Sequence, residues 1–242
     1  MRDAHFVHGA FESKPEQLAF HFPERKQGVS FLRGGAMRYA ARQGGSWSGQ
    51  GLDEIQSDPH LGTKIGQAYS AAQVIPSARV HAAYGAMRDE TASQFDYLTK
   101  ARHEGGLGVK VEFTDHDPYE HHQAMQDDIL KNRRLQVNQS ATTGGHPFFS
   151  DEENDKFRAV HDAFGHAAIG RSFSRHGEEA AFHSHAQMYS PLAKEAMTAE
   201  TRGQNNAMNY GHGEGFPEQK MVTLPSWASR SRVGAFNTAA SP

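Results

Sequence analysis

Apolar and polar positions follow a helical period over much of the chain and a strand period in a short central stretch. Residues 78–103 carry apolar side chains at helical spacing and are followed by Gly105-Gly106, which predicts a helix that ends there. Residues 109–113 alternate apolar and charged side chains, which predicts a short half-buried strand. Residues 135–137 predict a second short strand. Sheet is therefore expected to be a minor component.

The second half of the chain is predicted to be helical. Ser150-x-x-Glu153 matches a capping box and places a helix directly after Ser150. The helices expected on either side of this signal cover residues 119–131, 151–169, 177–189 and 191–203. Residues beyond 203 are interrupted by Gly and Pro and predict loop. The expected fold class is mainly α with a small β component, in a single helical domain.

Residues 1–63 show little periodicity and contain glycine-rich and turn-forming stretches, such as Gly44-Gly45 and the run over residues 49–51. We therefore expect a flexible N-terminal arm or linker over residues 1–63. The helical domain is expected to occupy residues 64–242.

Composition narrows the function classes. The chain has 242 residues, no cysteine and a net charge of -3, without a long basic run. Thiolate metal sites and disulfides are excluded, and binding of nucleic acid through a broad basic face is not favoured. Neither a membrane span nor a secretory apolar segment is evident. We expect a cytoplasmic location, the host cytoplasm if the chain is phage-encoded, with a virion location as the alternative.

The most informative segment contains His161 and His166, which are the best candidates for metal ligands. Five residues span about 140° on an ideal α-helix, so these two side chains would not share a face. A π-bulge widens the turn and brings positions five apart close to eclipsing. Gly165 lies where the backbone would have to yield. We therefore predict a bulged helical turn that aims both imidazoles at one ion.

Two imidazoles leave a divalent ion short of charge, which a carboxylate can supply. No aspartate follows Asp162 in the sequence. The downstream carboxylates are those of Glu178, Glu179, Glu195, Glu200, Glu214 and Glu218.

The motif His161-x-x-x-Gly165-His166 resembles the His-x-x-x-Gly-His motif of the aromatic amino acid hydroxylases. Thr198-Ala199-Glu200 is similar to the Thr-x-Glu context in that family, and residues 210–213 are similar to its Tyr-Gly-x-Gly stretch. The likeness covers about residues 155–215. It implies a mononuclear non-haem iron held by His161, His166 and Glu200.

Other residues around the motif have expected roles as well. Glu179 and His183 are four apart on one helical face, so Glu179 is an alternative third ligand, and the run from Glu179 to His185 could orient the two histidines. Asp162 is expected to hydrogen-bond a ligand or the backbone, and Glu179 to act as a supporting catalytic carboxylate. His146 is interpreted as a turn residue.

The chain also departs from the hydroxylase pattern. Arg202 and Gln204 flank Glu200 where the family is apolar, so we expect a more polar pocket. No pterin-binding segment can be identified, which leaves the need for a pterin open. Residues 108–228 also resemble an uncharacterised module of bacteriophage and mobile-element proteins, a likeness that carries no chemistry.

Three function classes follow from these observations. The first is an Fe(II) oxygenase that uses dioxygen and a small-molecule substrate. The second is a Zn(II)- or Mn(II)-dependent hydrolase with Glu179 as general base; His161-Asp162 also resembles the HD phosphohydrolases, with His146 as the earlier histidine, but the later aspartate of that motif is missing. The third is a non-enzymatic accessory protein with phage or mobile-element partners and a structural metal or none.

Overall fold

The computed structural model describes residues 28–75, 77–142, 145–211 and 217–230. It is mainly helical with a small sheet, as predicted. Its helices and strands are α1 (Ser30–Arg42), α2 (Pro59–Ala71), α3 (Ala78–Thr99), β1 (Lys110–Thr114), α4 (His122–Asn132), β2 (Arg134–Asn138), α5 (Asp151–Val160), α6 (Arg175–His185), α7 (Pro191–Thr198) and α8 (Gln204–Tyr210). Two π-helical segments, His161–Ala167 and Ala199–Gly203, continue α5 and α7. Within the described ranges, no helix is long and apolar enough to cross a membrane.

The two predicted strands are both present, and they pair in parallel. Lys110 lies opposite Arg134 and Thr114 opposite Asn138. Parallel neighbouring strands need a crossover connection, and here α4 is the crossover between β1 and β2. The sheet is thus one strand–helix–strand unit at the side of a helical body.

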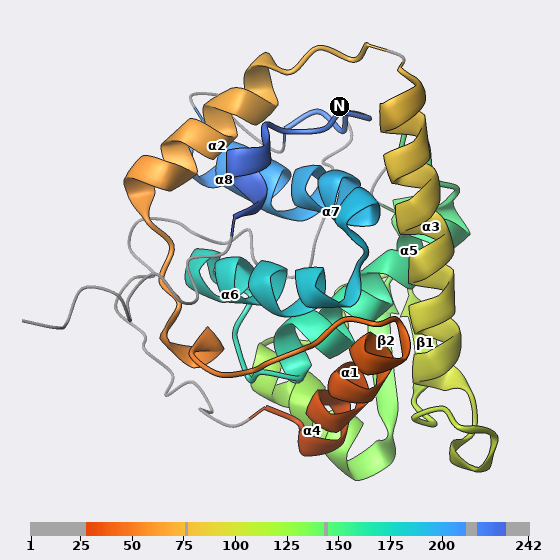
Figure 1. The fold of residues 1–242 in the computed structure, drawn as a ribbon. Coiled ribbons are helices and arrows are strands. Elements are labelled where there is room, and N and C mark those ends of the chain that lie inside the picture. Colours follow the sequence, from red (N-terminus) through yellow and green to blue (C-terminus); the bar gives the residue numbers. More distant parts are fainter. Residues whose placement is uncertain (1–27, 76, 143–144, 212–216, 231–242) are drawn as a thin grey trace, which may run out of the picture.

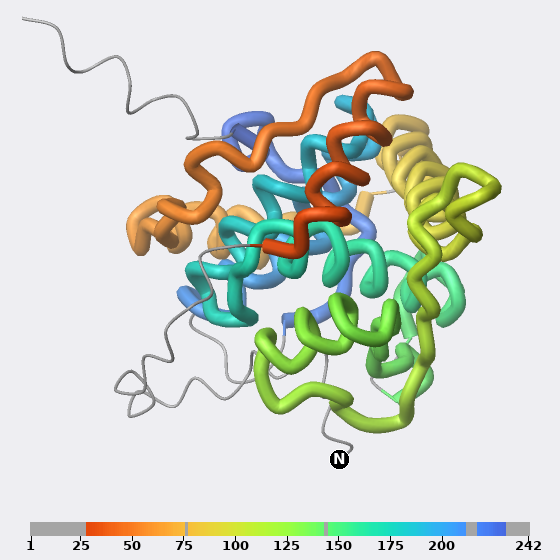
Figure 2. Tube along the Cα trace, turned by 90° about the horizontal axis from the view of Figure 1, so that it is seen from below, coloured from red at the N-terminus to blue at the C-terminus, as the bar shows by residue number. Residues whose placement is uncertain are grey.

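Helix α6 runs through the middle of the molecule (Figure 1). Helices α2, α7 and α8 lie on one side of it, α1, α4 and the sheet lie on the other, and α3 runs along the flank. The tube view in Figure 2 shows α1 crossing over the central helices from outside. Segments before and after the predicted metal motif therefore meet around α6.

The prediction of an N-terminal arm is wrong for residues 28–63, whereas residues 1–27 lie outside the described part of the chain. Helix α1 buries Leu32, Ala36, Tyr39 and Ala40, which recur at helical spacing and enter the main core. The backbone N–H of Val29 donates to Ala167 O at 2.8 Å and so ties the start of α1 to the first π-helix. Residues 28–63 belong to the same body as the rest.

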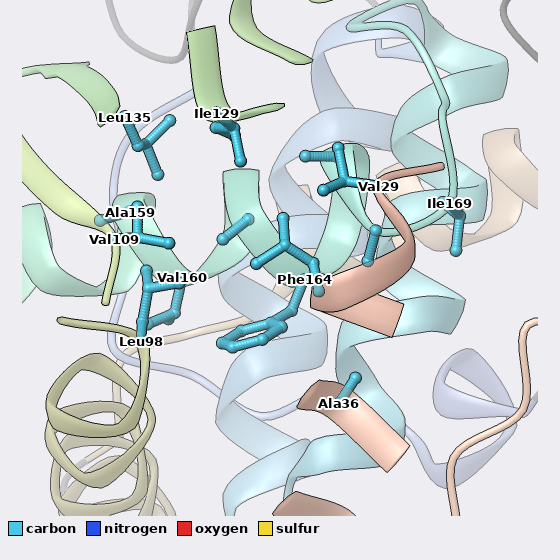
Figure 3. Close-up of a cluster of buried hydrophobic side chains, with 14 of the residues drawn as sticks. Val29, Ala36, Leu98, Val109, Ile129, Leu135, Ala159, Val160, Phe164 and Ile169 are labelled. Atoms are coloured by element: carbon cyan, nitrogen blue, oxygen red, sulfur yellow. The ribbon is translucent and has the colours of Figure 1, made fainter. Parts of the chain in front are cut away.

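The largest apolar cluster packs around α5 and the first π-helix. Val160 and Phe164 are fully buried, and Figure 3 shows Val29 and Ala36 beside Phe164. The capping box at Ser150 and Glu153 is formed as predicted and fixes where α5 starts. Because both ends of this segment are anchored, the predicted metal motif lies on rigid, buried backbone.

The loop predicted after residue 203 is wrong for residues 204–210, which form α8. Gly203 does not end the helix. A Cβ at Gly203 would lie 2.8 Å from the ring of Tyr69, so the glycine is needed for close packing of α2. The chain therefore continues from α7 through the second π-helix into α8.

Replacing Leu32 with alanine tests whether α1 belongs to the core. Leu32 is 0% exposed, so we expect Leu32→Ala to lower the free energy of unfolding by about 2–5 kcal/mol. Met37 on the same helix is 53% exposed, so Met37→Ala should change stability by less than about 0.5 kcal/mol. Urea titration followed by circular dichroism measures both. Equal stability of the two variants would contradict the docking of α1.

Candidate metal centre

The predicted bulged turn is present. Residues His161–Ala167 form a π-helix, in which the N–H of Ala168 donates to Ala163 O at 2.9 Å. The wider turn brings the rings of His161 and His166 to a centroid distance of 5.1 Å, with planes 87° apart. The two imidazoles meet edge to face on the side turned towards α6.

Helix α6 holds this turn in place. A Cβ at Gly165 would lie 3.2 Å from both Ala181 Cβ and His161 Nδ1, so glycine allows α6 to approach the turn closely. Ser184 of α6 donates from its hydroxyl to Phe164 O at 2.6 Å. That carbonyl belongs to the widened turn, where the regular α-helical hydrogen-bond pattern is altered. This hydrogen bond therefore gives the Phe164 carbonyl a donor and fixes the position of α6 against the turn.

The third member of the ligand group is Glu178, which follows on α6. Its Oε2 lies 3.6 Å from His161 Nε2, and its Oε1 lies 3.4 Å from His166 Nε2. Two ligand atoms each about 2.1 Å from one ion can have such a separation. All three side chains are buried, and one atom from each lies within 4.8 Å of the others. This group can hold a metal ion.

The charges within the group are strongly coupled. Burial opposes ionisation of Glu178, but the positive charge on His166 and hydrogen bonding to His161 lower the pKa of Glu178 well below its ordinary value. Burial likewise favours neutral His166, but the Glu178 carboxylate raises the pKa of His166 above its ordinary value. The site is therefore built to hold a carboxylate together with a compensating positive charge.

Glu178 Oε1 is the atom best placed to bind a cation. It is buried, yet it receives no well-oriented hydrogen bond from any residue that the structure describes. A buried carboxylate oxygen in this condition loses water without gaining a donor, which is costly. A metal ion bonded to Oε1 would remove that cost, so the residues present fit a bound ion.

A chain of buried hydrogen bonds sets the tautomer of His161. His185 Nε2 lies 2.8 Å from Gln94 Oε1, and Gln94 Nε2 donates to Met188 O at 3.4 Å. His185 is neutral because burial lowers its pKa well below the ordinary value. Its Nε2–H therefore donates to Gln94, and its Nδ1 accepts from His161 Nδ1–H at 3.2 Å. His161 Nε2 is left on the side of Glu178.

His166 is oriented by the backbone. Its Nδ1–H donates to Arg171 O at 3.2 Å, which leaves Nε2 towards Glu178. The Arg171 guanidinium donates in turn to Asp53 O at 2.7 Å and to Ile55 O at 3.1 Å. Hydrogen bonds that fix the second ring nitrogen are typical of histidines that bind metals. Both candidate ligands have this arrangement.

Asp162 is buried in the same turn, at 1% exposure. Its negative charge acts on His166 in the same direction as that of Glu178, and it also favours the charged form of the buried Arg158. Asp162 therefore adds to the negative potential around the histidines, and it is outside the ligand group.

Glu200 does not take the place that the hydroxylase resemblance implies. It lies in the second π-helix, where its Oε1 accepts from the Tyr84 hydroxyl at 2.6 Å and its Oε2 accepts from Gln204 Nε2 at 2.6 Å. His146 lies in a turn, as predicted, where its Nδ1 accepts from the N–H groups of Phe148 and Phe149, and its Nε2 lies 3.2 Å from Glu200 Oε2. The Glu200 carboxylate is thus bound by Tyr84 and Gln204. The carboxylate beside His161 and His166 is that of Glu178.

Glu179 is also outside the ligand group. Its Oε2 accepts from Arg202 Nε at 3.0 Å, its Oε1 is bound by Arg202 Nη2, and His183 Nε2 lies 3.2 Å from Oε1. Burial opposes its ionisation, but the hydrogen bond from His183 and the charge of Arg202 lower the pKa of Glu179 to about 2. This carboxylate therefore fixes Arg202, and it is too weak a base for proton abstraction at neutral pH.

Sequence reasoning ranked Glu178 behind its neighbours and missed Gln94 and Arg171. The helical period of α6 could have identified Glu178. Ala181 follows it by three positions and His185 by seven, so all three side chains lie on the face of α6 that meets the π-helix. Gln94 and Arg171 contact the histidines only through tertiary packing, which no local pattern reveals.

No protein-family model, curated protein or solved structure matches this chain. The geometry of the site is therefore the basis for a functional assignment.

Removing each candidate carboxylate separates the two choices of third ligand. We expect Glu178→Gln and His161→Ala to reduce bound metal to background, whereas Glu200→Gln should keep the metal content of the unchanged protein. The physical reason is that, among the carboxylates that the structure describes, only Glu178 has its oxygens beside both Nε2 atoms. Elemental analysis of folded, desalted protein after loading with Fe(II) under nitrogen measures this. Loss of metal in Glu200→Gln with Glu178→Gln unaffected would reverse the assignment.

Replacing His185 tests the hydrogen bond that orients His161. His185→Phe keeps a ring of similar size but removes the acceptor for His161 Nδ1–H, so we expect metal affinity to fall about 10–100-fold. His60→Phe, at an exposed position on α2, is the matched control and should leave affinity unchanged. Competition with a chromophoric chelator gives both dissociation constants. Identical values would show that His185 has no orienting role.

Proposed function

We propose that this chain is a mononuclear non-haem Fe(II) oxygenase. The observation that carries the proposal is the buried group of His161, His166 and Glu178, two imidazoles and one carboxylate. Such a set on one side of an ion is typical of Fe(II) sites that leave positions open for other ligands. When bound, iron in this setting would supply the activation of dioxygen.

The protein residues would contribute orientation and charge. Gln94 and His185 keep a proton on His161 Nδ1, and Arg171 O keeps one on His166 Nδ1, so both Nε2 atoms remain available as ligands. Glu178 would supply one negative charge to the ion, and buried Asp162 adds negative charge nearby. Burial of all three ligands excludes bulk water from their side of the ion.

The stoichiometry of such a reaction requires a second reactant. If one oxygen atom of dioxygen enters a substrate C–H bond as hydroxyl, the other leaves as water. Two electrons and two protons are then needed from an organic two-electron reductant. A pterin would meet this requirement, as in the family that the motif resembles, and so would other reductants of the same class.

One observation favours an oxygenase over the hydrolase that would use Glu179 as its general base. Glu179, the general base that a zinc hydrolase would need, is held by Arg202 and His183 with a pKa of about 2. The site also has three protein ligands rather than the four of a closed structural zinc site, which supports a reactive ion over a purely structural one.

Nitric oxide tests the proposal without knowledge of the substrate, because it binds Fe(II) where dioxygen would. We expect the Fe(II)-loaded protein to give a high-spin iron–nitrosyl signal in electron paramagnetic resonance, and to consume dioxygen slowly with ascorbate as reductant. Glu178→Gln should lose both responses, whereas Glu200→Gln should keep them.

An iron-loaded, folded sample that binds no nitric oxide and takes up no dioxygen would contradict the oxygenase. Zinc in protein purified without added metal, together with hydrolytic activity, would favour the second function class. Loss of folding in His161→Ala, with no activity in the unchanged protein, would indicate a structural ion.

A further inference from the structure

A pocket beside Glu178 has a lining made entirely of polar and charged side chains. Glu178 and Glu179 form part of its wall. The remaining lining residues are Ser57, Arg175, Thr201, Arg202, Asn205 and Asn206. A wall of this kind offers no apolar or aromatic surface against which a hydrophobic ring could pack.

Arg175 carries the unpaired positive charge of this pocket. Arg202 is neutralised by Glu179, which binds its guanidinium through both oxygens. A divalent ion bound by Glu178 would add positive charge beside the pocket, reduced by the carboxylates of Glu178 and Asp162. Arg175 is exposed, and no carboxylate within the described ranges pairs with it. An anion would therefore meet the unpaired charge of Arg175 and be attracted by the neighbouring ion.

The hydrogen-bonding groups of the pocket favour the same kind of ligand. Asn205 Oδ1 accepts from Asn209 Nδ2 at 2.7 Å, which leaves the NH₂ of Asn205 as the donating end of its amide. Ser57 also lines the pocket, and its N–H donates to His176 Nδ1 at 3.0 Å. Arg175 can offer parallel N–H donors to an oxyanion, which is its preferred geometry.

We propose that this pocket binds the substrate or co-substrate of the site as a small hydrophilic anion, a carboxylate or a phosphate. Arg175 and the amide of Asn205 would bind the anionic group, and the ion held by Glu178 would add attraction from the other end. The proposal rests on the proposed metal site. It predicts a substrate class different from aromatic amino acids, since the pocket has no surface for a ring.

Titration with simple anions tests this. Protein loaded with Co(II), whose visible spectrum reports on the ligand environment, is titrated calorimetrically and spectroscopically with inorganic phosphate, malonate and uncharged malonamide. We expect phosphate or malonate to bind at least about tenfold more tightly than malonamide, as expected for a hydrogen bond between charged groups. The anion that binds better identifies the source of the anionic group.

Arg175→Gln should weaken binding of the favoured anion about tenfold and leave Co(II) content unchanged. Arg38→Gln, which removes an exposed arginine from α1, should bind like the unchanged protein. If metal is bound but neither anion binds, or if Arg175→Gln binds as well as Arg38→Gln, the anion pocket is wrong and the metal site stands. If no metal is bound, the oxygenase fails, and the same titration of metal-free protein still decides whether Arg175 binds an anion.

Discussion

The close contact between the first π-helix and α6 is the constraint on which the site depends. Gly165 lets Ala181 approach, and Ser184 donates to Phe164 O at the widened turn. A π-turn alters the regular hydrogen-bond ladder, so it persists only where the surrounding structure compensates. The same face of α6 carries Glu178 and His185. One packing contact therefore places the third ligand and the residue that orients His161.

Burial explains why the ligand group needs a positive charge. A carboxylate removed from water is costly unless a partner compensates it, and Glu178 Oε1 lacks a well-placed donor among the described residues. Without metal, a proton on His166 supplies that charge, which is why the pKa of His166 is raised and that of Glu178 lowered. With metal, the ion replaces the proton. Metal and proton thus compete for one buried position, and the binding energy of the metal contributes to folding stability.

The local features of the site could be predicted from sequence, and its tertiary partners could not. Backbone geometry alone decides which helical positions lie above one another, so the five-residue spacing of His161 and His166 was enough to predict a π-turn. That turn is present. Glu200 was preferred over Glu178 on resemblance, but the second π-helix turns it towards Tyr84 and Gln204. The misplaced arm has a different cause. Gly35 indicates close packing rather than flexibility, since a Cβ there would lie 2.6 Å from Leu107.

Residues 28–63, which were predicted to be an arm, contact the residues that surround the candidate metal ligands. Trp47 Nε1 donates to Ser184 O at 2.9 Å, on the residue that also supports the π-turn. Arg171 binds the carbonyls of Asp53 and Ile55 while its own carbonyl orients His166. The chain then reaches the pocket at Ser57. The candidate ligands are thus placed by α5, the π-turn and α6, whereas the lining of the pocket depends in part on residues far outside the histidine motif. A search by that motif alone would therefore find the candidate metal centre without indicating what surrounds it.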